Sequence, residues 1–160
     1  MVFSEKLLEE TLLRLTDLMS DCTDPWCVFG GAALYLHGYR DIPFSDIDVL
    51  VSKADCERVR KAWNLRNEAD GGTDLFRSDF LLHPHLGPLD VEIMSNFEIF
   101  ADMRWQPIDI GDPIETRLGS AIVPVASLEK IKSILRLSGR DKDLARLKLI
   151  DMPARSLATP

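Results

Sequence analysis

The sequence predicts an α/β (α+β) fold, in which helices flank a small mixed β-sheet and also form the C-terminus. Three observations support this class. A short apolar run, Cys27–Phe29, ends at a glycine pair and is followed by a small-residue helical stretch and a second apolar run. Leu89–Met94 alternates apolar and acidic residues, which is typical of a half-buried strand. Beyond Ser127 the apolar residues recur at helical spacing, which indicates a helical end to the chain.

The first half of the chain alternates helical and strand patterns. The expected elements are a helix over 4–19, a strand over 27–29, a helix over 32–37, a strand over 45–51 and a helix over 53–63. Ser4 and Ser52 precede the first and the last of these helices, where a serine can cap free N–H groups. Gly38 follows the middle helix and is expected to end it.

The second half has shorter patterns separated by turns. The expected elements are a strand over 74–82, a strand over 89–94 that forms a hairpin with it, a short helix over 96–101, strand-like runs over 107–110 and 121–125, and helices over 128–137 and 141–150. Ser127 is placed to cap the first of the two last helices. Because no repeat or linker divides the chain, we expect one domain over 1–152 and a flexible tail over 153–160.

Composition limits the classes of function. Hydrophobic residues make up 46% of the 160 residues, which is typical of a globular domain. The net charge is −7, so nucleic acid, which is bound chiefly through Lys and Arg, is not expected as a partner. No apolar run approaches the roughly 20 residues that cross a bilayer, and we expect no membrane contact. The three cysteines lack metal-binding spacing and are expected to be reduced thiols of a cytoplasmic protein.

The most informative stretch, 28–51, combines glycines with carboxylates. Asp46 and Asp48 stand two residues apart in a predicted strand, so their side chains project to the same face. Adjacent carboxylates repel each other unless a proton or a cation lies between them, and the hard ions Mg²⁺ and Mn²⁺ prefer oxygen ligands. Gly30 and Gly31 open a predicted helix, whose N–H groups suit a phosphate. The stretch therefore predicts metal-assisted phosphoryl or nucleotidyl transfer.

This arrangement resembles the nucleotidyltransferase superfamily, which has the DNA polymerase β-like fold. The resemblance rests on Gly30-Gly31, on Asp46-Ile47-Asp48 followed by an apolar strand, and on a carboxylate in Leu89-Asp90-Val91. It covers about 26–94. The chain is most similar to small bacterial members: minimal nucleotidyltransferases, the lincosamide and aminoglycoside nucleotidyltransferases of antibiotic resistance, and toxin–antitoxin enzymes of the same fold.

The resemblance implies a reaction and assigns residues to it. A nucleoside monophosphate would pass from an NTP, with ATP expected, to a hydroxyl of a small-molecule acceptor, and pyrophosphate would be released. Asp46, Asp48 and Asp90 would be catalytic and would bind two Mg²⁺ ions, with Mn²⁺ as a substitute. Asp90 would also lie near the acceptor oxygen as its general base. Gly30 and Gly31 would hold phosphates through their backbone N–H groups.

Further residues are candidates for the same site. By the resemblance, Arg40, Ser45 and Lys142 would bind the nucleotide, with Arg140 as the alternative to Lys142. Glu92 lies two residues after the third aspartate and shares its face of the strand. It is either an additional metal ligand or part of the acceptor pocket.

Two other features leave a role open. The loop over 39–45 carries Pro43 and Phe44, where family members run more simply from an arginine to the aspartate pair. His83 and His85 flank a proline in a predicted turn. A solvated ring is the more common outcome for turn histidines, and a metal role is the alternative.

A rival function comes from another class. The same fold can serve as a non-catalytic binding module or as a toxin–antitoxin component that modifies a protein. Loss of the carboxylates would favour a binding module, and the sequence retains them. Because 160 residues leave little chain for the second wall of a cleft, we expect that a homodimer or an antitoxin-like partner completes it.

Overall fold

The structure, a computed structural model, describes residues 4–152 and confirms the predicted fold class. The predicted tail, 153–160, lies outside the described residues. The helices are α1 (Glu5–Leu18), α2 (Gly30–Leu36), α3 (Lys53–Ala62), α4 (Leu128–Ser138) and α5 (Asp141–Ile150). The strands are β1 (Cys27–Phe29), β2 (Asp46–Leu50), β3 (Phe76–Arg77), β4 (Phe80–Leu82), β5 (Asp90–Ser95), β6 (Glu98–Ala101), β7 (Arg104–Pro107), β8 (Ile114–Leu118) and β9 (Ala121–Val125).

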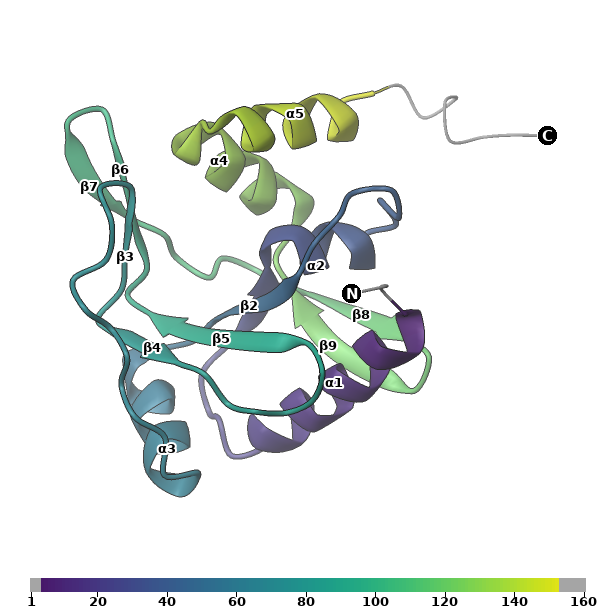
Figure 1. Cartoon of the computed structure of the whole chain (residues 1–160), viewed down its shortest axis with the longest axis vertical. Coiled ribbons are helices and arrows are strands. Elements are labelled where there is room, and N and C mark those ends of the chain that lie inside the picture. Colours follow the sequence, from purple (N-terminus) through teal and green to yellow (C-terminus); the bar gives the residue numbers. More distant parts are fainter. Residues whose placement is uncertain (1–3, 153–160) are drawn as a thin grey trace.

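The strands form two sheets (Figure 1). The larger sheet has the order β4-β5-β2-β1-β9-β8 and is mixed. β1 runs antiparallel to β2 and parallel to β9, while β2 runs parallel to β5. The smaller sheet, β3-β6-β7, is antiparallel and rises from the β4–β5 end of the larger sheet toward α4 and α5.

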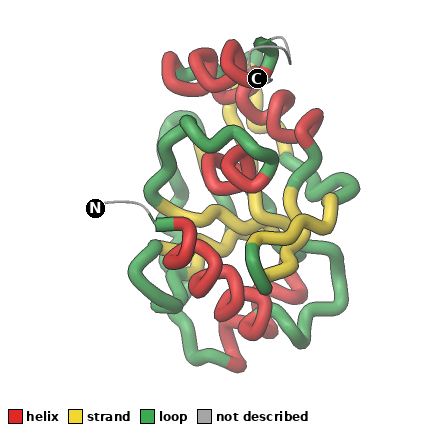
Figure 2. Tube along the Cα trace, turned by 90° about the vertical axis from the view of Figure 1, so that its right-hand side faces the viewer, coloured by secondary structure: helices red, strands yellow, loops and turns green. Residues whose placement is uncertain are grey.

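Helices cover the larger sheet from both sides. α1 packs against β9 and α3 packs against β5, below the sheet in Figure 1. α2 packs against β1 and β2 on the other side, and the paired helices α4 and α5 lie above it. Figure 2 shows the same layering in a view turned by 90°, with strands between the upper and lower helices.

The core explains why the central strand presents its carboxylates on one side only. Ile47 and Val49 are fully buried and alternate with Asp46 and Asp48 along β2. Residues that alternate along a strand point to opposite faces, so β2 packs one face into the core. Its other face carries the two acidic side chains.

The segment after β5 is not the short helix that the sequence predicted over 96–101. Asn96 adopts the left-handed conformation, with φ 49°, and turns the chain back into β6. Within β6, Ile99 is fully buried while Phe100 is exposed. The helix prediction was wrong because Asn96 makes a left-handed turn, a conformation that asparagine tolerates well.

Two strand predictions also change, and one strand was not predicted. The run over 74–82 is divided into β3 and β4, which join different sheets, although β4 does form the predicted antiparallel pair with β5. The strand expected over 107–110 lies earlier, as β7. The sequence did not predict β8, because only its last residue, Leu118, is buried and the strand has no alternating pattern.

Two of the predicted helix caps are confirmed. The Ser52 and Ser127 hydroxyl oxygens each accept a hydrogen bond at 3.1 Å from the backbone N–H three residues later. Ser4 precedes α1 but makes no such side-chain bond. Within residues 4–152, the helices are all too short or too polar to cross a lipid bilayer.

A buried carboxylate fixes the C-terminal helix pair. Asp143 is 1% exposed and accepts hydrogen bonds from Arg140 N, Nε and Nη2 at 3.2, 2.7 and 3.0 Å. Burial raises the pKa of Asp143, but the hydrogen bonds from Arg140 and Ser138 outweigh it, so the pKa is lowered overall. The Arg140 guanidinium also lies 4.8 Å from the centre of the Phe76 ring, which links α5 to β3.

Asp143→Asn is expected to lower the free energy of unfolding by about 2 kcal/mol at neutral pH, because charge-assisted hydrogen bonds to Arg140 are lost. The folded-state pKa of Asp143 lies below its unfolded value. This stabilisation is therefore present above the pKa of Asp143 in the unfolded chain, which is about 4. It is lost as the pH falls through the pKa of Asp143 in the folded protein. Urea unfolding of both proteins across this range checks the effect.

The exposed neighbour Asp141 supplies the control, because it lies in the same first turn of α5. Asp141→Asn should cost no more than about 0.5 kcal/mol. An equal loss in the two variants, or a loss at Asp143 that does not shrink in acid, would contradict the role given to the buried carboxylate.

Candidate active site

The parallel pairing of β2 with β5 places two pairs of acidic residues side by side. Asp46 lies opposite Asp90, and Asp48 lies opposite Glu92. Residues two apart on a strand share a face, so all four carboxylates project from the same side of the sheet. The sequence predicted both acidic strands, and the structure makes them direct neighbours.

Three of the four carboxylates form a compact cluster. Oxygens of Asp46, Asp48 and Glu92 lie within 4.8 Å of one another, a spacing at which three carboxylates can share a metal ion. Burial raises the pKa of Asp48 well above its usual range, and the charges of Asp46 and Glu92 raise it further. Burial, with the charges of Glu92 and Asp90, also raises the pKa of Asp46. The cluster therefore holds negative charge that a divalent cation would neutralise.

The structure places Asp90 outside this cluster. Asp90 is the first residue of β5, and its side chain is exposed. Its charge still acts on Asp46. The sequence put Asp90 in the ligand set and Glu92 beside it, whereas the geometry brings Glu92 closer to Asp46 and Asp48. Asp90 and Glu92 share one face of β5. Only the register of β5 against β2 therefore determines which of them lies beside Asp48.

The glycine pair is packed tightly against the acidic strand. Gly30 has φ 72°, and a Cβ placed on it would lie 2.6 Å from Asp48 Oδ2. A Cβ on Gly31 would lie 2.6 Å from the Cβ of Phe44. A Cβ at either position would therefore force a neighbour to move, and the start of α2 lies directly beside the carboxylates with no side chain between them.

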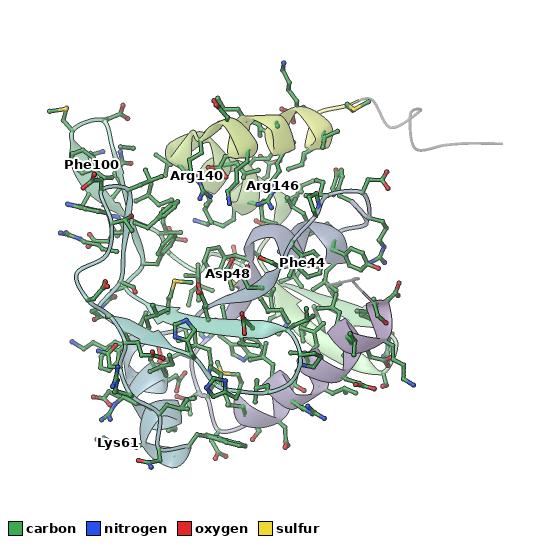
Figure 3. The ribbon with its side chains drawn as sticks, viewed as in Figure 1. Phe44, Asp48, Lys61, Phe100, Arg140 and Arg146 are labelled. Atoms are coloured by element: carbon green, nitrogen blue, oxygen red, sulfur yellow. The ribbon has the colours of Figure 1, made fainter. Side chains whose placement is uncertain are left out.

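Basic residues of α5 face the acidic cluster. Figure 3 shows Arg146 on α5, and Arg140 at the residue before this helix, on the side of the molecule that faces Asp48 of β2. Burial is the main cause of the raised pKa of Asp46 and Asp48, and the positive charges of Lys142 and Arg146 partly oppose it. Arg146 Nη2 also donates a hydrogen bond to the Pro43 carbonyl oxygen at 2.9 Å, which ties α5 to the loop before the aspartate pair.

The acidic and basic residues line opposite walls of one cavity. Its volume is about 670 Å³, which lies within the usual range for small-ligand sites. Phe29, Phe76 and Phe97 line an apolar part of it, with ring centres 5.5 and 5.7 Å apart along the series Phe29–Phe97–Phe76. The cavity thus combines two regions of opposite charge with an aromatic surface.

Most of the nucleotide-binding candidates line this cavity. Gly30, Gly31, Ser45 and Lys142 are among its lining residues. Arg40 is not, because its guanidinium stacks 4.1 Å from the centre of the Tyr35 ring, in the exposed loop after α2.

Arg146 was not among the residues predicted for the site from the sequence. A signal for it was present, since Lys142 and Arg146 are four residues apart on one helix and therefore share a face. The aromatic lining gave no such signal. Phe29 ends β1, Phe76 belongs to β3, and Phe97 lies between β5 and β6, so only the tertiary fold brings the three together.

Comparisons with known proteins give structural neighbours but no sequence relatives. No protein-family profile matches the sequence, and no curated protein matches it. A protein of Thermotoga maritima described as a candidate nucleotidyltransferase aligns with a TM-score of 0.63 and 20% identity, over 91% of this chain and 91% of that chain.

Two further solved structures align over most of the chain. The antibiotic-resistance factor ANT(2'')-Ia has a TM-score of 0.51 and 17% identity, over 96% of this chain and 84% of that chain. JHP933 of Helicobacter pylori has a TM-score of 0.51 and 17% identity, over 93% of this chain and 67% of that chain. The chain has a nucleotidyltransferase-like fold, as the resemblance in its sequence predicted.

Gly30→Ala is expected to destabilise the protein more than Gly38→Ala. Both glycines have positive φ, 72° and 104°, so either alanine would be strained. That strain is about 1–2 kcal/mol. A Cβ at Gly38 meets nothing within 4 Å, whereas a Cβ at Gly30 collides with the Asp48 carboxylate. The Gly30 variant should lose at least about 1 kcal/mol more in urea unfolding. Equal losses would show that Asp48 can move aside without cost.

Proposed function

We propose that the protein is a metal-dependent nucleotidyltransferase that moves a nucleoside monophosphate from an NTP to a hydroxyl of a small-molecule acceptor and releases pyrophosphate. One observation carries this proposal: a carboxylate cluster and a set of Lys and Arg side chains line opposite walls of the same cavity. A nucleoside triphosphate needs both, because its phosphates are bound by cations and its metal ions by carboxylates.

The donor set fits Mg²⁺ or Mn²⁺. Asp46, Asp48 and Glu92 offer three oxygen ligands, the type that these hard ions prefer. Burial and the neighbouring carboxylates raise the pKa values of Asp46 and Asp48, and a bound divalent cation would offset this repulsion. Two such ions would neutralise phosphate charge and stabilise the attacking and leaving oxygens, as in other enzymes of this chemistry.

Glu92 is the third ligand in this proposal, in the role that the sequence gave to Asp90. The register of β5 supports this choice, since Glu92 lies opposite Asp48 at the cavity wall and Asp90 lies at the exposed strand start. Asp90 keeps a separate role. It extends the acidic row toward solvent, where an incoming acceptor hydroxyl could transfer its proton to a carboxylate.

The opposite wall would hold the nucleotide. Lys142 and Arg146 face the carboxylates and supply positive charge for the triphosphate. The backbone N–H groups of Gly30 and Gly31 would add hydrogen bonds to phosphate oxygens at the start of α2. Ser45 lines the same cavity and can donate its hydroxyl. These contacts orient the substrate and restrain its reacting group.

We infer a small acceptor rather than nucleic acid. The net charge of −7 disfavours a long polyanion, and the cavity volume of about 670 Å³ is typical of small-ligand sites. An antibiotic is one class to test, because a structural neighbour is an antibiotic-resistance factor.

A non-catalytic binding module of the same fold is the weaker proposal. Burying carboxylates that repel one another lowers stability, and a binding module gains nothing from that arrangement.

The central test of the proposal is nucleotidyl transfer itself. Incubation with labelled NTPs, Mg²⁺ or Mn²⁺, and a panel of aminoglycosides, lincosamides and cell extract, followed by mass spectrometry, should reveal an acceptor that gains a nucleoside monophosphate. Loss of transfer in Asp48→Asn would assign it to this site. Nucleotide binding that is indifferent to metal and to Asp48→Asn would favour a binding module.

Glu92→Gln should weaken Mn²⁺ binding far more than Asp90→Asn. Loss of a carboxylate ligand removes both charge and coordination, so we expect at least about a tenfold loss of affinity for Glu92→Gln. Asp90 lies outside the cluster, so Asp90→Asn should change affinity by no more than about threefold, through its weaker electrostatic effect. Isothermal titration with Mn²⁺ measures both. The reverse order would restore Asp90 to the ligand set.

Lys142→Ala should weaken binding of ATP in the presence of Mg²⁺ by about tenfold, because a charge-assisted contact to phosphate is lost. Lys148→Ala is the matched control, since Lys148 is exposed on the same helix and does not line the cavity. It should leave affinity unchanged within about twofold. A similar loss in both variants would indicate only a general effect of net charge.

A further inference from the structure

His83 lies between the carboxylate cluster and Glu68, an acidic residue outside that cluster. Its Nε2 lies 3.3 Å from Glu92 Oε1, and its Nδ1 lies 2.8 Å from Glu68 Oε2. Glu68 belongs to the long connection between α3 and β3, and Glu92 belongs to β5. A single imidazole ring therefore spans two carboxylates that come from distant parts of the chain.

The backbone explains why this histidine and not its neighbour faces Glu92. β4 pairs with β5 so that Leu81 lies opposite Met94 and Leu82 opposite Ile93. One more step along the same register brings His83 opposite Glu92. Pro84 follows and cannot continue the pairing as a donor, because it has no N–H. His85 comes after the proline and is exposed.

Glu68 is held in place independently of the histidine. Its backbone N–H donates to the Leu81 carbonyl oxygen at 2.8 Å. The neighbouring Asn67 side chain accepts from Leu81 N at 3.0 Å and donates to the Asp79 carbonyl oxygen at 3.0 Å. This segment is thus fixed along the outer edge of β4. Its position gives the His83 ring a fixed partner on the side away from the cluster.

Glu92 needs such support, because its neighbours repel it. Asp46 and Asp48 lie within the same 4.8 Å cluster and carry like charge. A glutamate side chain has several rotatable bonds, so repulsion alone would turn it away from the aspartates. A ring N–H that donates a hydrogen bond to one oxygen of Glu92 opposes this movement. The second oxygen of Glu92 then stays available to bind a metal ion.

We propose that His83 is a positioning residue, which orients Glu92 for metal binding while Glu68 fixes the histidine ring. This inference rests on the proposed function, since it concerns the cluster assigned there to a divalent ion. It gives a role to a histidine that the sequence left as a solvated turn residue or a metal ligand. Groups that hold a metal ligand from behind commonly contribute about 10–100-fold to metal affinity.

The test measures Mn²⁺ binding by the protein without nucleotide, using isothermal titration and the electron paramagnetic resonance signal of the bound ion. His83→Ala should weaken binding by about tenfold. Glutamine can place its NH₂ group near the position of Nε2, whereas the shorter asparagine places its own near Nδ1. His83→Gln should therefore bind within about threefold of wild type, and His83→Asn should resemble His83→Ala.

His85→Ala is the control and should bind Mn²⁺ as the wild type does. Glu68→Gln keeps the ring but weakens its support, so a smaller loss of roughly threefold is expected. This variant also tests the inference if the His83 variants fail to fold. Thermal unfolding without metal separates a general loss of structure from a specific loss of affinity.

The outcomes separate the two proposals. If the wild type binds no Mn²⁺, or binds it equally well after Glu92→Gln, the metal site itself is overturned. The proposed function is then overturned with it. A Glu92-dependent site that is unchanged in His83→Ala, or weakened equally in His83→Gln and His83→Asn, would overturn the positioning role alone. A loss confined to the alanine and asparagine variants would support it.

Discussion

The whole site depends on the parallel register between β2 and β5. That register sets Asp48 opposite Glu92, which brings three carboxylates within 4.8 Å of one another on one face of the sheet. Like charges held this close in a partly buried place oppose folding unless something offsets them. The chain supplies part of the offset from Lys142 and Arg146 across the cavity. The fold thus maintains a separation of charge that would suit a metal–nucleotide complex.

The cavity exists because the C-terminal helices are held over the sheet at several independent points. Asp143 fixes Arg140 at the start of α5, and Arg140 reaches the Phe76 ring on β3. Arg146 is bonded to the Pro43 carbonyl oxygen on the other side of the cavity. The second wall, for which the sequence suggested a homodimer or a partner, is thus formed at least in part by α4 and α5 of this chain.

Local patterns in the sequence predicted local features well. The glycine pair, the acidic pair of β2, the alternation of β5 and the serine caps of α3 and α4 were all visible, because each depends on residues close together in the chain. Choosing between Asp90 and Glu92 was beyond the sequence, since both occupy one face and the register depends on pairing with a distant strand. The turn at Asn96 was missed because asparagine suits both a helix cap and a left-handed turn. His83 lacked any helical or alternating pattern, and its partner Glu68 lies in an irregular segment.

Metal binding by the carboxylate cluster is tested most clearly by crystallography. Crystals of the protein would be soaked with Mn²⁺ and a non-hydrolysable ATP analogue, and anomalous scattering would be recorded at the manganese edge. We expect anomalous density bounded by Asp46, Asp48 and Glu92, with the phosphates directed toward Lys142 and Arg146. Manganese bound elsewhere, or a nucleotide seated outside this cavity, would contradict it.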